Sequence, residues 1–295
     1  MTQRQTDIAI IGAGPQALTL VTHILQKKDK LRSRIQVFDP SGTWMSRWHQ
    51  QFAAQEIPQL RSPAVHHPDP NPHALRTFAE GRYPELHPPY DRPGTQLFQE
   101  FCATVIHRWQ LQEYVTPAQV TQLQPLGGNP SRFCLSLDTG DTVLARRVVL
   151  ATGGGQPYVP EWVHQVESTY PPERLCHAGQ VRLPALPSLR GETVLIVGSG
   201  LTSGHLAAGA VQRGARVVMM ARRTFQEKLF DADPGWLGPK YLKGFHAEPD
   251  MQARWQMVQQ ARNGGSLTPE MMTHLRRLER QGQLTVYEHC QVAHA

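Results

Sequence analysis

Two glycine-rich turns carry the residue types and spacing that could bind a dinucleotide. The first begins at Gly12 after the apolar run 8–11, and the second begins at Gly198 after the apolar run 193–197. Helical periodicity follows both, so each turn joins a predicted strand to a predicted helix. A helix N-terminus presents N–H groups and a positive dipole end to a diphosphate, and glycine allows close approach. The predicted diphosphate-binding residues are Gly12, Ala13, Gly14, Pro15 and Gln16 in the first turn and Gly198, Ser199, Gly200, Leu201, Thr202 and Ser203 in the second.

The residues that end the next strand differ in charge between the two turns. Asp39 ends the predicted strand 34–38, and a carboxylate there can accept hydrogen bonds from ribose hydroxyls. Arg222 and Arg223 follow the predicted strand 216–220, where guanidinium groups can bind the 2′-phosphate that distinguishes NADPH from NADH. The alternative for this pair is two solvated arginines on a surface turn. The arginines predict NADPH at the second turn.

The two βαβ patterns define the expected fold class, which is α/β with two Rossmann-like dinucleotide-binding domains. A β-hairpin insertion is predicted between them, formed by residues 133–137 and 143–150. A proline-punctuated connector follows at 157–190 and favours a domain boundary. We therefore expect a first domain over residues 1–165 and a second over residues 166–295.

Three further elements are predicted from local patterns. Apolar residues at helical spacing over 95–111 indicate an amphipathic helix. Residues 269–281 indicate a helix with Thr268 as its N-cap, followed by a last strand over 284–288. The stretch 57–92, rich in proline and histidine, is too interrupted for long regular elements.

Composition limits the class of protein. The chain has 295 residues, 18% of them charged, with a net charge of +6 and no block of Lys or Arg, which disfavours nucleic-acid binding. Its four cysteines show no CxxC spacing, which excludes a redox dithiol and indicates reduced thiols. Glycines and a proline interrupt the uncharged stretch 8–26, so we expect a strand and a helix there rather than a membrane span. A soluble cytoplasmic protein without a membrane partner is the prediction.

The combined pattern resembles the flavoproteins with two dinucleotide-binding domains, and within them the class B flavin monooxygenases. Besides the two glycine turns, residues 39–44 (DPSGTW) resemble the GGTW segment that follows the ribose-binding acid of these enzymes. Residues 148–153 (VVLATG) resemble the strand that returns under the FAD. Residues 59–63 (QLRSP) resemble a segment of N-hydroxylating lysine and ornithine monooxygenases and of oxidative-stress-induced growth inhibitor proteins. The resemblance covers most of residues 7–225.

This resemblance implies an FAD-dependent oxidoreductase that uses NADPH, with FAD at the first turn. In that family NADPH reduces FAD, and the reduced flavin reacts with molecular oxygen to give a C4a-hydroperoxide that oxygenates a small nucleophilic substrate. Because the flavin carries this chemistry, no catalytic side chain is predicted. The resemblance adds Thr43, Trp44, Arg47, Trp48, Leu60, Val120, Ala151, Thr152 and Gly153 to the cofactor-binding residues. For Trp44 and Trp48, plain core packing is an equal alternative.

The sequence departs from the family pattern at two places. Around residues 175–181 the fingerprint FxGxxxHxxxF keeps its histidine, His177, but has Val181 at the aromatic position. The sequence reaches Ala295 directly after the last predicted strand, where such families return to the FAD domain, so we expect that return to be missing. Two alternatives stay open: an NADPH-dependent flavin reductase of a quinone or protein acceptor, and a non-catalytic dinucleotide-binding regulatory protein. The oligomeric state is not predicted.

Two other segments have unusual composition. His66, His67, Asp69 and His73 could be offered as metal ligands, but they lie in a proline-rich segment without fixed spacing. Solvated loop histidines and no metal site are predicted there. Residues 231–241 combine glycines, aromatics and a lysine, which predicts a long loop, either a lid over the nicotinamide or an ordered surface loop.

Overall fold

The chain forms two compact units. The computed structural model describes residues 3–128, 132–154, 157–166, 171, 174–262 and 264–293. The first unit consists of Met1–Phe52 and Pro58–Pro157, and the second of Ala53–Ile57 and Tyr158–Ala295. The chain therefore passes into the second unit at the start of the connector 157–190, before the predicted boundary after residue 165.

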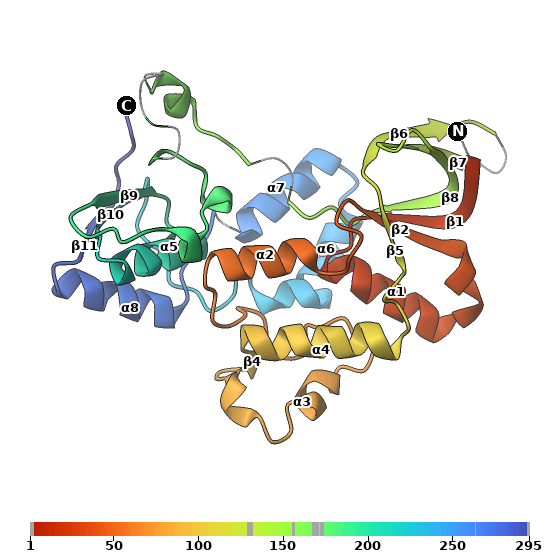
Figure 1. Cartoon of the computed structure of the whole chain (residues 1–295), viewed down its shortest axis with the longest axis horizontal. Helices are drawn as coiled ribbons and strands as arrows, with labels where there is room; N and C mark the ends of the chain where they lie inside the picture. The colour runs from red at the N-terminus through yellow and green to blue at the C-terminus, as the bar shows by residue number, and fades with distance from the viewer. Residues whose placement is uncertain are drawn as a thin grey trace. The chain divides into compact units, whose positions relative to one another are not determined.

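The first unit contains a six-stranded sheet in the order β5-β2-β1-β8-β7-β6. Strands β5, β2, β1 and β8 run parallel, and β7 and β6 continue the sheet as an antiparallel meander (Figure 1). The strands are β1 Gln3–Ile11, β2 Ile35–Asp39, β5 Val115–Pro117, β6 Val120–Leu126, β7 Arg132–Leu137 and β8 Thr142–Leu150. The predicted hairpin between 133–137 and 143–150 is confirmed as β7 and β8.

Helices bury one face of this sheet because their apolar residues recur at helical spacing. In α1, Leu18, Val21 and Leu25 lie on one side and are fully buried with Ile10 of the sheet. The meander covers the other face, where Ala9 and Phe38 pack with residues of β7 and β8. The helical elements are α1 Pro15–Lys27, η1 Asp29–Arg34, α2 Ser46–Ala54, α3 Ala74–Phe78, η2 Tyr83–Glu85 and α4 Thr95–Arg108, with a small ribbon of β3 Leu86–His87 and β4 Arg92–Pro93.

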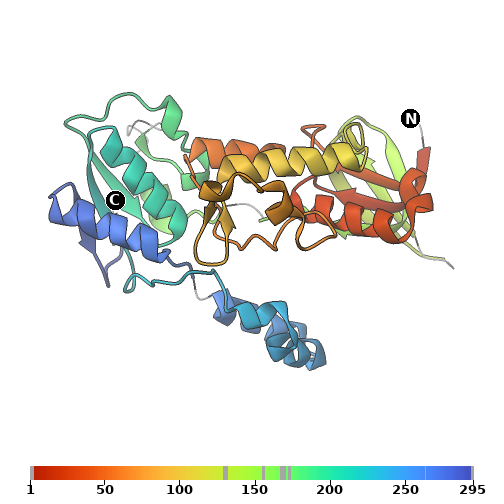
Figure 2. The same cartoon turned by 90° about the horizontal axis from the view of Figure 1, so that it is seen from below.

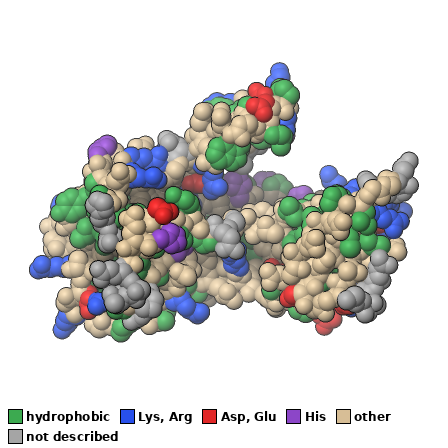
Figure 3. Space-filling model, turned by 90° about the horizontal axis from the view of Figure 1, so that it is seen from above, with side chains coloured by type: hydrophobic (Ala, Val, Ile, Leu, Met, Phe, Trp, Pro, Cys, Tyr) green, Lys and Arg blue, Asp and Glu red, His purple; other side chains and the backbone are tan. Residues whose placement is uncertain are grey.

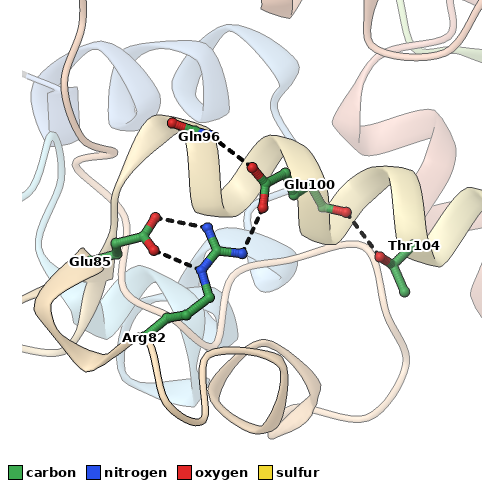
Figure 4. Close-up of polar contacts among 5 residues, drawn as sticks. All are labelled: Arg82, Glu85, Gln96, Glu100 and Thr104. Carbon is green, nitrogen blue, oxygen red and sulfur yellow. Dashed lines mark hydrogen bonds and ion pairs between the residues drawn. The ribbon is translucent and has the colours of Figure 1, made fainter.

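The interrupted stretch 57–92 is fixed to α4 by ion pairs. Arg82 Nε and Nη1 lie 2.6 Å from Glu85 Oε1 and from Glu100 Oε2, respectively (Figure 4). Gln96 donates to the Glu100 carboxylate, which orients it toward Arg82. The two carboxylates raise the pKa of Arg82, which keeps it charged. A segment without long elements thereby acquires a defined place on the helix.

The histidine segment differs from its prediction at His67. The structure buries His67, whose ring lies edge-on to Phe101 at 5.1 Å between centroids, so the prediction of solvated histidines is wrong there. Its Nδ1 accepts a hydrogen bond from the backbone N–H of Asp69, and Arg108 Nη1 lies 2.9 Å from Asp69 Oδ2. These residues fix the segment to α4, a long-range contact that the local composition does not reveal. In the ranges that the structure describes, no three His, Cys, Asp or Glu side chains are grouped to bind a metal ion.

The second unit contains a three-stranded parallel sheet in the order β11-β10-β9. Helices α5 and α8 lie together on one face of it (Figure 2). Leu195, Val197 and Tyr287 on the opposite face are exposed. The predicted N-cap of α8 is confirmed, since the Thr268 side chain accepts a hydrogen bond from Met271 N. The elements are η3 Glu161–Gln165, η5 Ala178–Gln180, η6 Leu183–Ala185, β9 Thr193–Val197, α5 Leu201–Gln212, β10 Arg216–Met220, α8 Pro269–Arg280 and β11 Leu284–Tyr287.

Residues 231–241 form short helical elements instead of the predicted long loop. They contain η7 Pro234–Leu237 and the start of α6 Pro239–Ala247, and α7 Met251–Arg262 follows. The Asp233 side chain accepts from Gly235 N at 2.7 Å, which caps η7. The ring of Trp236 stacks on that of Tyr241 with 5.4 Å between centroids. The loop prediction failed because aromatic packing stabilises helical turns in a glycine-rich segment.

No helix in the described part of the chain is long and apolar enough to cross a bilayer. The longest there, α4, has 14 residues, whereas a transmembrane helix needs about 20. On the face shown in Figure 3, hydrophobic side chains are interspersed with polar and charged ones.

Candidate dinucleotide sites

The first glycine turn is fixed by the carboxyl ends of three strands. Gly12 follows β1, and its N–H donates to the Phe38 carbonyl of β2 at 2.8 Å. Ala151 follows β8 and donates its N–H to the Ile11 carbonyl at 2.8 Å. Gly12 has a φ of +101°, and a Cβ built on it would lie 2.4 Å from the Ala151 carbonyl oxygen. Only glycine therefore fits at position 12.

The N-terminus of α1 is open to an anion. Gly14 is the N-cap and Pro15 occupies the first helical turn. Within the described residues no side chain caps this end, and the first helical bond is the one from Leu18 N to Gly14 O at 3.1 Å. The N–H groups of the first turn are thus left for a ligand. A diphosphate fits this arrangement.

The structure brings Asp39 to the first glycine turn. Its Oδ2 accepts a hydrogen bond from Ala13 N at 3.1 Å. Its Oδ1 accepts from the N–H of Ser41 at 3.0 Å and from the Ser41 hydroxyl at 2.6 Å. A carboxylate oxygen can accept two hydrogen bonds, so Oδ2 keeps one site for a ribose hydroxyl. The predicted ribose ligand is therefore in direct contact with the first glycine turn.

The segment after Asp39 returns to the same turn. Met45 donates its N–H to the Ala13 carbonyl at 2.8 Å and adopts a φ of +63°. Thr43 lies exposed in this segment, and its N–H is 3.3 Å from the Ser41 hydroxyl. Arg47, in the first turn of α2, is also exposed. The role of Met45 was not predicted from the sequence, because its hydrogen bond is made through the backbone.

The aromatic candidates belong to the core of the first unit. Trp44 is buried, and its indole N–H donates to the Leu111 carbonyl at 2.8 Å. Trp48 stacks on Phe52 with 4.0 Å between ring centroids. Leu60 is buried in the same core. For both tryptophans the geometry favours the core-packing alternative, and no contact with a flavin ring is needed to account for them.

Replacing Trp44 with phenylalanine tests this assignment. We expect Trp44→Phe to lower the free energy of unfolding by about 0.5–1.5 kcal/mol, because the buried Leu111 carbonyl loses one of its two hydrogen bonds and keeps the one from Tyr114 N. The flavin content of the purified variant should equal that of the wild type. Urea unfolding and the visible absorbance measure the two effects, and Trp109→Phe, on a partly buried indole near the same core, is the matched control. A folded Trp44→Phe protein without flavin would contradict the core assignment.

The other residues predicted near the first site lie at two places. Thr152 and Gly153 follow Ala151 at the end of β8 and are exposed, and Gly153 has a φ of +74°. Val120 begins β6 and packs, partly buried, in the cluster that includes Phe38. Ala151, Thr152 and Gly153 lie at the sheet end that also carries Gly12, whereas Val120 lies on β6, the edge strand of the meander.

The second glycine turn repeats the first in the second unit. Gly198 N donates to the Met220 carbonyl at 2.9 Å, and a Cβ on Gly198 would lie 2.8 Å from Ser203 Oγ. Gly200 is the N-cap of α5, and no side chain of the described residues caps it. Leu201, Thr202 and Ser203 form the first turn of α5 and are partly buried. The turn fits a second diphosphate, with Ser199 between the two glycines.

His205 follows this turn on α5 and adds no charge to it. Burial lowers the pKa of His205 to about 4, because the interior disfavours the charged imidazolium. The imidazole is therefore neutral at pH 7. Positive charge beside the second turn comes instead from the residues after β10.

The two arginines after β10 differ in their surroundings. Arg222 is exposed. Arg223 is partly buried, and its Nη2 donates to the Gly265 carbonyl at 3.3 Å. Gly265 in turn lies beside the second turn, since a Cβ on it would be 3.4 Å from Gly200 Cα. The sequence prediction did not include Gly264 or Gly265, although a Gly-Gly pair is a turn signal.

Comparison with known proteins relates these sites to a family. An FAD-NAD(P)-binding family model matches residues 9–155, and the L-lysine 6-monooxygenase/L-ornithine 5-monooxygenase family model matches residues 96–293, more than half of the chain. No curated protein sequence matches the chain.

Solved structures share the fold. The FAD-bound cadaverine monooxygenase of desferrioxamine biosynthesis from Erwinia amylovora is 14% identical with a TM-score of 0.73, covering 98% of this chain and 70% of that one. Ornithine hydroxylase from Pseudomonas aeruginosa is 14% identical with a TM-score of 0.72, covering 99% and 75%. The ornithine N-hydroxylase of Kutzneria sp. 744, with reduced FAD, NADP+ and ornithine, is 15% identical with a TM-score of 0.72, covering 98% and 74%.

The family match and the shared fold agree with the geometry of the two turns. The chain belongs to the L-lysine 6-monooxygenase/L-ornithine 5-monooxygenase family and is an FAD- and NADPH-dependent oxidoreductase of the monooxygenase class.

Proposed function

We propose that the chain hydroxylates the nitrogen of a small primary amine, with FAD at the first turn and NADPH at the second. The observation that carries the proposal is the opposite charge at two otherwise matching turns. Asp39 contacts the first turn through Ala13, and Arg222 follows the strand beside the second. A carboxylate suits ribose hydroxyls, and a guanidinium suits a 2′-phosphate.

The substrate class comes from the relatives. The family description names lysine and ornithine, and the similar solved structures include cadaverine and ornithine monooxygenases. These substrates share a primary amine on a short aliphatic chain. Bound FAD, once reduced, supplies the activation of molecular oxygen, and the residues of this chain bind the two dinucleotides and fix their orientation.

The proposed reaction balances with one molecule each of oxygen and NADPH. One oxygen atom enters an N–H bond of the amine to give a hydroxylamine. The second oxygen atom leaves as water, which takes up the two electrons and the proton of the NADPH hydride and one further proton from solvent. We assign FAD to residues 1–165 and NADPH to residues 166–295.

All four cysteines are free, which fits a reducing compartment, and we place the protein in the cytoplasm.

Product analysis tests the proposal. Purified protein supplemented with FAD is mixed with NADPH, oxygen and one of cadaverine, ornithine or lysine, and products are measured by mass spectrometry. We expect NADPH consumption that depends on one amine and a product heavier by one oxygen atom, which becomes labelled in ¹⁸O₂. NADPH oxidation that requires a quinone and gives no hydroxylated amine would show a flavin reductase instead. Nucleotide binding without any oxidation would show a regulatory protein.

A further inference from the structure

A pair of glycines lies beside the second glycine turn. Gly264 and Gly265 adopt φ values of +70° and +94°. A Cβ on Gly265 would lie 3.4 Å from Gly200 Cα, so this backbone closely approaches the N-cap of α5. In the sequence the pair begins two residues after the end of α7, and the buried residues Ser266 and Leu267 follow it. Its place depends on a conformation that residues other than glycine rarely adopt.

Backbone hydrogen bonds join this segment to the chain that leaves β10. Leu267 N donates to the Gln226 carbonyl at 2.9 Å, and Lys228 N donates to the Leu267 carbonyl at 2.9 Å. Leu267 also packs against α5, since a Cβ on Gly204 would lie 3.0 Å from Leu267 Cδ2. The segment is therefore fixed at Leu267, three residues beyond Gly264. A separate contact involves the glycine pair itself.

Arg223 makes that contact. Its Nη2 donates to the Gly265 carbonyl at 3.3 Å. The guanidinium also lies close against Gly264, because a Cβ there would be 2.5 Å from Nη2 and 3.0 Å from Cζ. One side chain thus contacts both glycines, and its planar group needs the space that a missing Cβ leaves. Arg222, which precedes it, is exposed.

We infer that Arg223 is a positioning residue that fixes the Gly264–Gly265 turn beside Gly200, and that Arg222 is the member of this arginine pair that distinguishes NADPH from NADH. The inference rests on the proposed function, which places NADPH at the second turn. The Gly264–Gly265 turn bounds the region around the diphosphate, and both nicotinamide dinucleotides share that group. Loss of Arg223 must then weaken both nucleotides equally. Loss of a 2′-phosphate ligand would weaken NADPH alone.

Binding measurements on the full chain loaded with FAD separate the two roles. Dissociation constants of NADP+ and NAD+ are measured by calorimetry for Arg223→Gln, with Arg216→Gln as the matched control. Arg216 lies at the opposite end of the same strand and is exposed. We expect Arg223→Gln to weaken both nucleotides roughly three- to tenfold, the range of a lost hydrogen bond, with their ratio unchanged. A loss confined to NADP+ would overturn the inference.

Gly264→Ala disturbs the same contact from the other side. Its new Cβ would displace the guanidinium, so we expect it to reproduce the effect of Arg223→Gln on both nucleotides. The double variant with Arg223→Gln and Gly264→Ala should weaken the binding of each nucleotide by less than the product of the two single effects, because each change removes the same contact. Fully independent effects would show that Arg223 and Gly264 do not act together.

Hydrogen exchange tests the positioning role without any nucleotide. Arg223→Gln should speed exchange of the amides at 264–267, including that of Leu267, relative to Arg216→Gln. Unchanged exchange there would overturn the inference even if nucleotide affinity falls. If the variant exchanges faster but the wild-type protein binds neither nucleotide, the positioning role stands and the proposed NADPH site is rejected. The failure of the inference and the failure of the proposed function are therefore distinguishable.

Discussion

Replacing Gly12 with alanine is expected to remove FAD from the protein. The new Cβ would lie 2.4 Å from the Ala151 carbonyl oxygen, at a φ of +101° that alanine rarely adopts. The turn must shift away from the end of β8, and the N–H groups of α1 then no longer converge on the diphosphate. Overpacking of this kind costs about 1–3 kcal/mol, so the first unit should also unfold more easily. Visible flavin absorbance and thermal unfolding measure both effects.

The control for Gly12→Ala is Gly127→Ala. Gly127 follows β6, and a Cβ built on it has no atom within 4 Å. We expect this variant to keep its flavin and its unfolding temperature. The Gly12→Ala protein should still bind NADP+, because the second turn belongs to the other unit. A yellow Gly12→Ala protein would show that FAD does not depend on this turn.

Replacing Arg222 with glutamine has the second large expected effect, on the choice between NADPH and NADH. Charge-assisted hydrogen bonds contribute about 1.5–3 kcal/mol, so the KM for NADPH should rise about 10- to 100-fold. NADH has no 2′-phosphate, and its KM should stay within about twofold of the wild-type value. Initial rates of NADPH and NADH oxidation at saturating FAD measure the ratio. An unchanged ratio would mean that Arg222 is a solvated arginine on a surface turn.

Salt dependence provides a second readout for Arg222. Because Arg222 is exposed, its attraction to a phosphate is screened by salt. The wild-type KM for NADPH should therefore rise with ionic strength more steeply than that of Arg222→Gln. Parallel salt dependences in the two proteins would argue against a direct contact with the 2′-phosphate.

The strand–turn–helix elements could be predicted because their signals are local. Apolar runs before Gly12 and Gly198, and helical periodicity after them, require no distant partner. The same is true of Thr268, which caps α8 through its own side chain. Where a glycine turn or a helix cap sets the backbone conformation, the neighbouring residues in the sequence are enough to predict the strand or helix.

Other features depend on partners far along the chain. The sequence allows Trp44 to contact a flavin or to pack in the core, and its hydrogen bond to the distant Leu111 carbonyl favours core packing. The composition of the stretch 57–92 predicts only that it lacks long regular elements, and its place on α4 depends on the distant ion pair between Arg82 and Glu100. In the second site, Arg223 and Arg222 are neighbours of the same residue type, but Arg223 is partly buried and contacts Gly264 and Gly265. Such long-range contacts give different roles to residues that have the same type and place in a sequence motif.

An anaerobic spectral titration tests the central claim most directly, namely that one chain binds FAD and lets NADPH reduce it. Purified protein is supplemented with FAD, freed of unbound flavin, and titrated with NADPH in the absence of oxygen. We predict a yellow protein whose flavin absorbance bleaches with one equivalent of NADPH and returns when oxygen is admitted. A protein that stays colourless, or whose bound flavin remains oxidised with excess NADPH, would contradict the account.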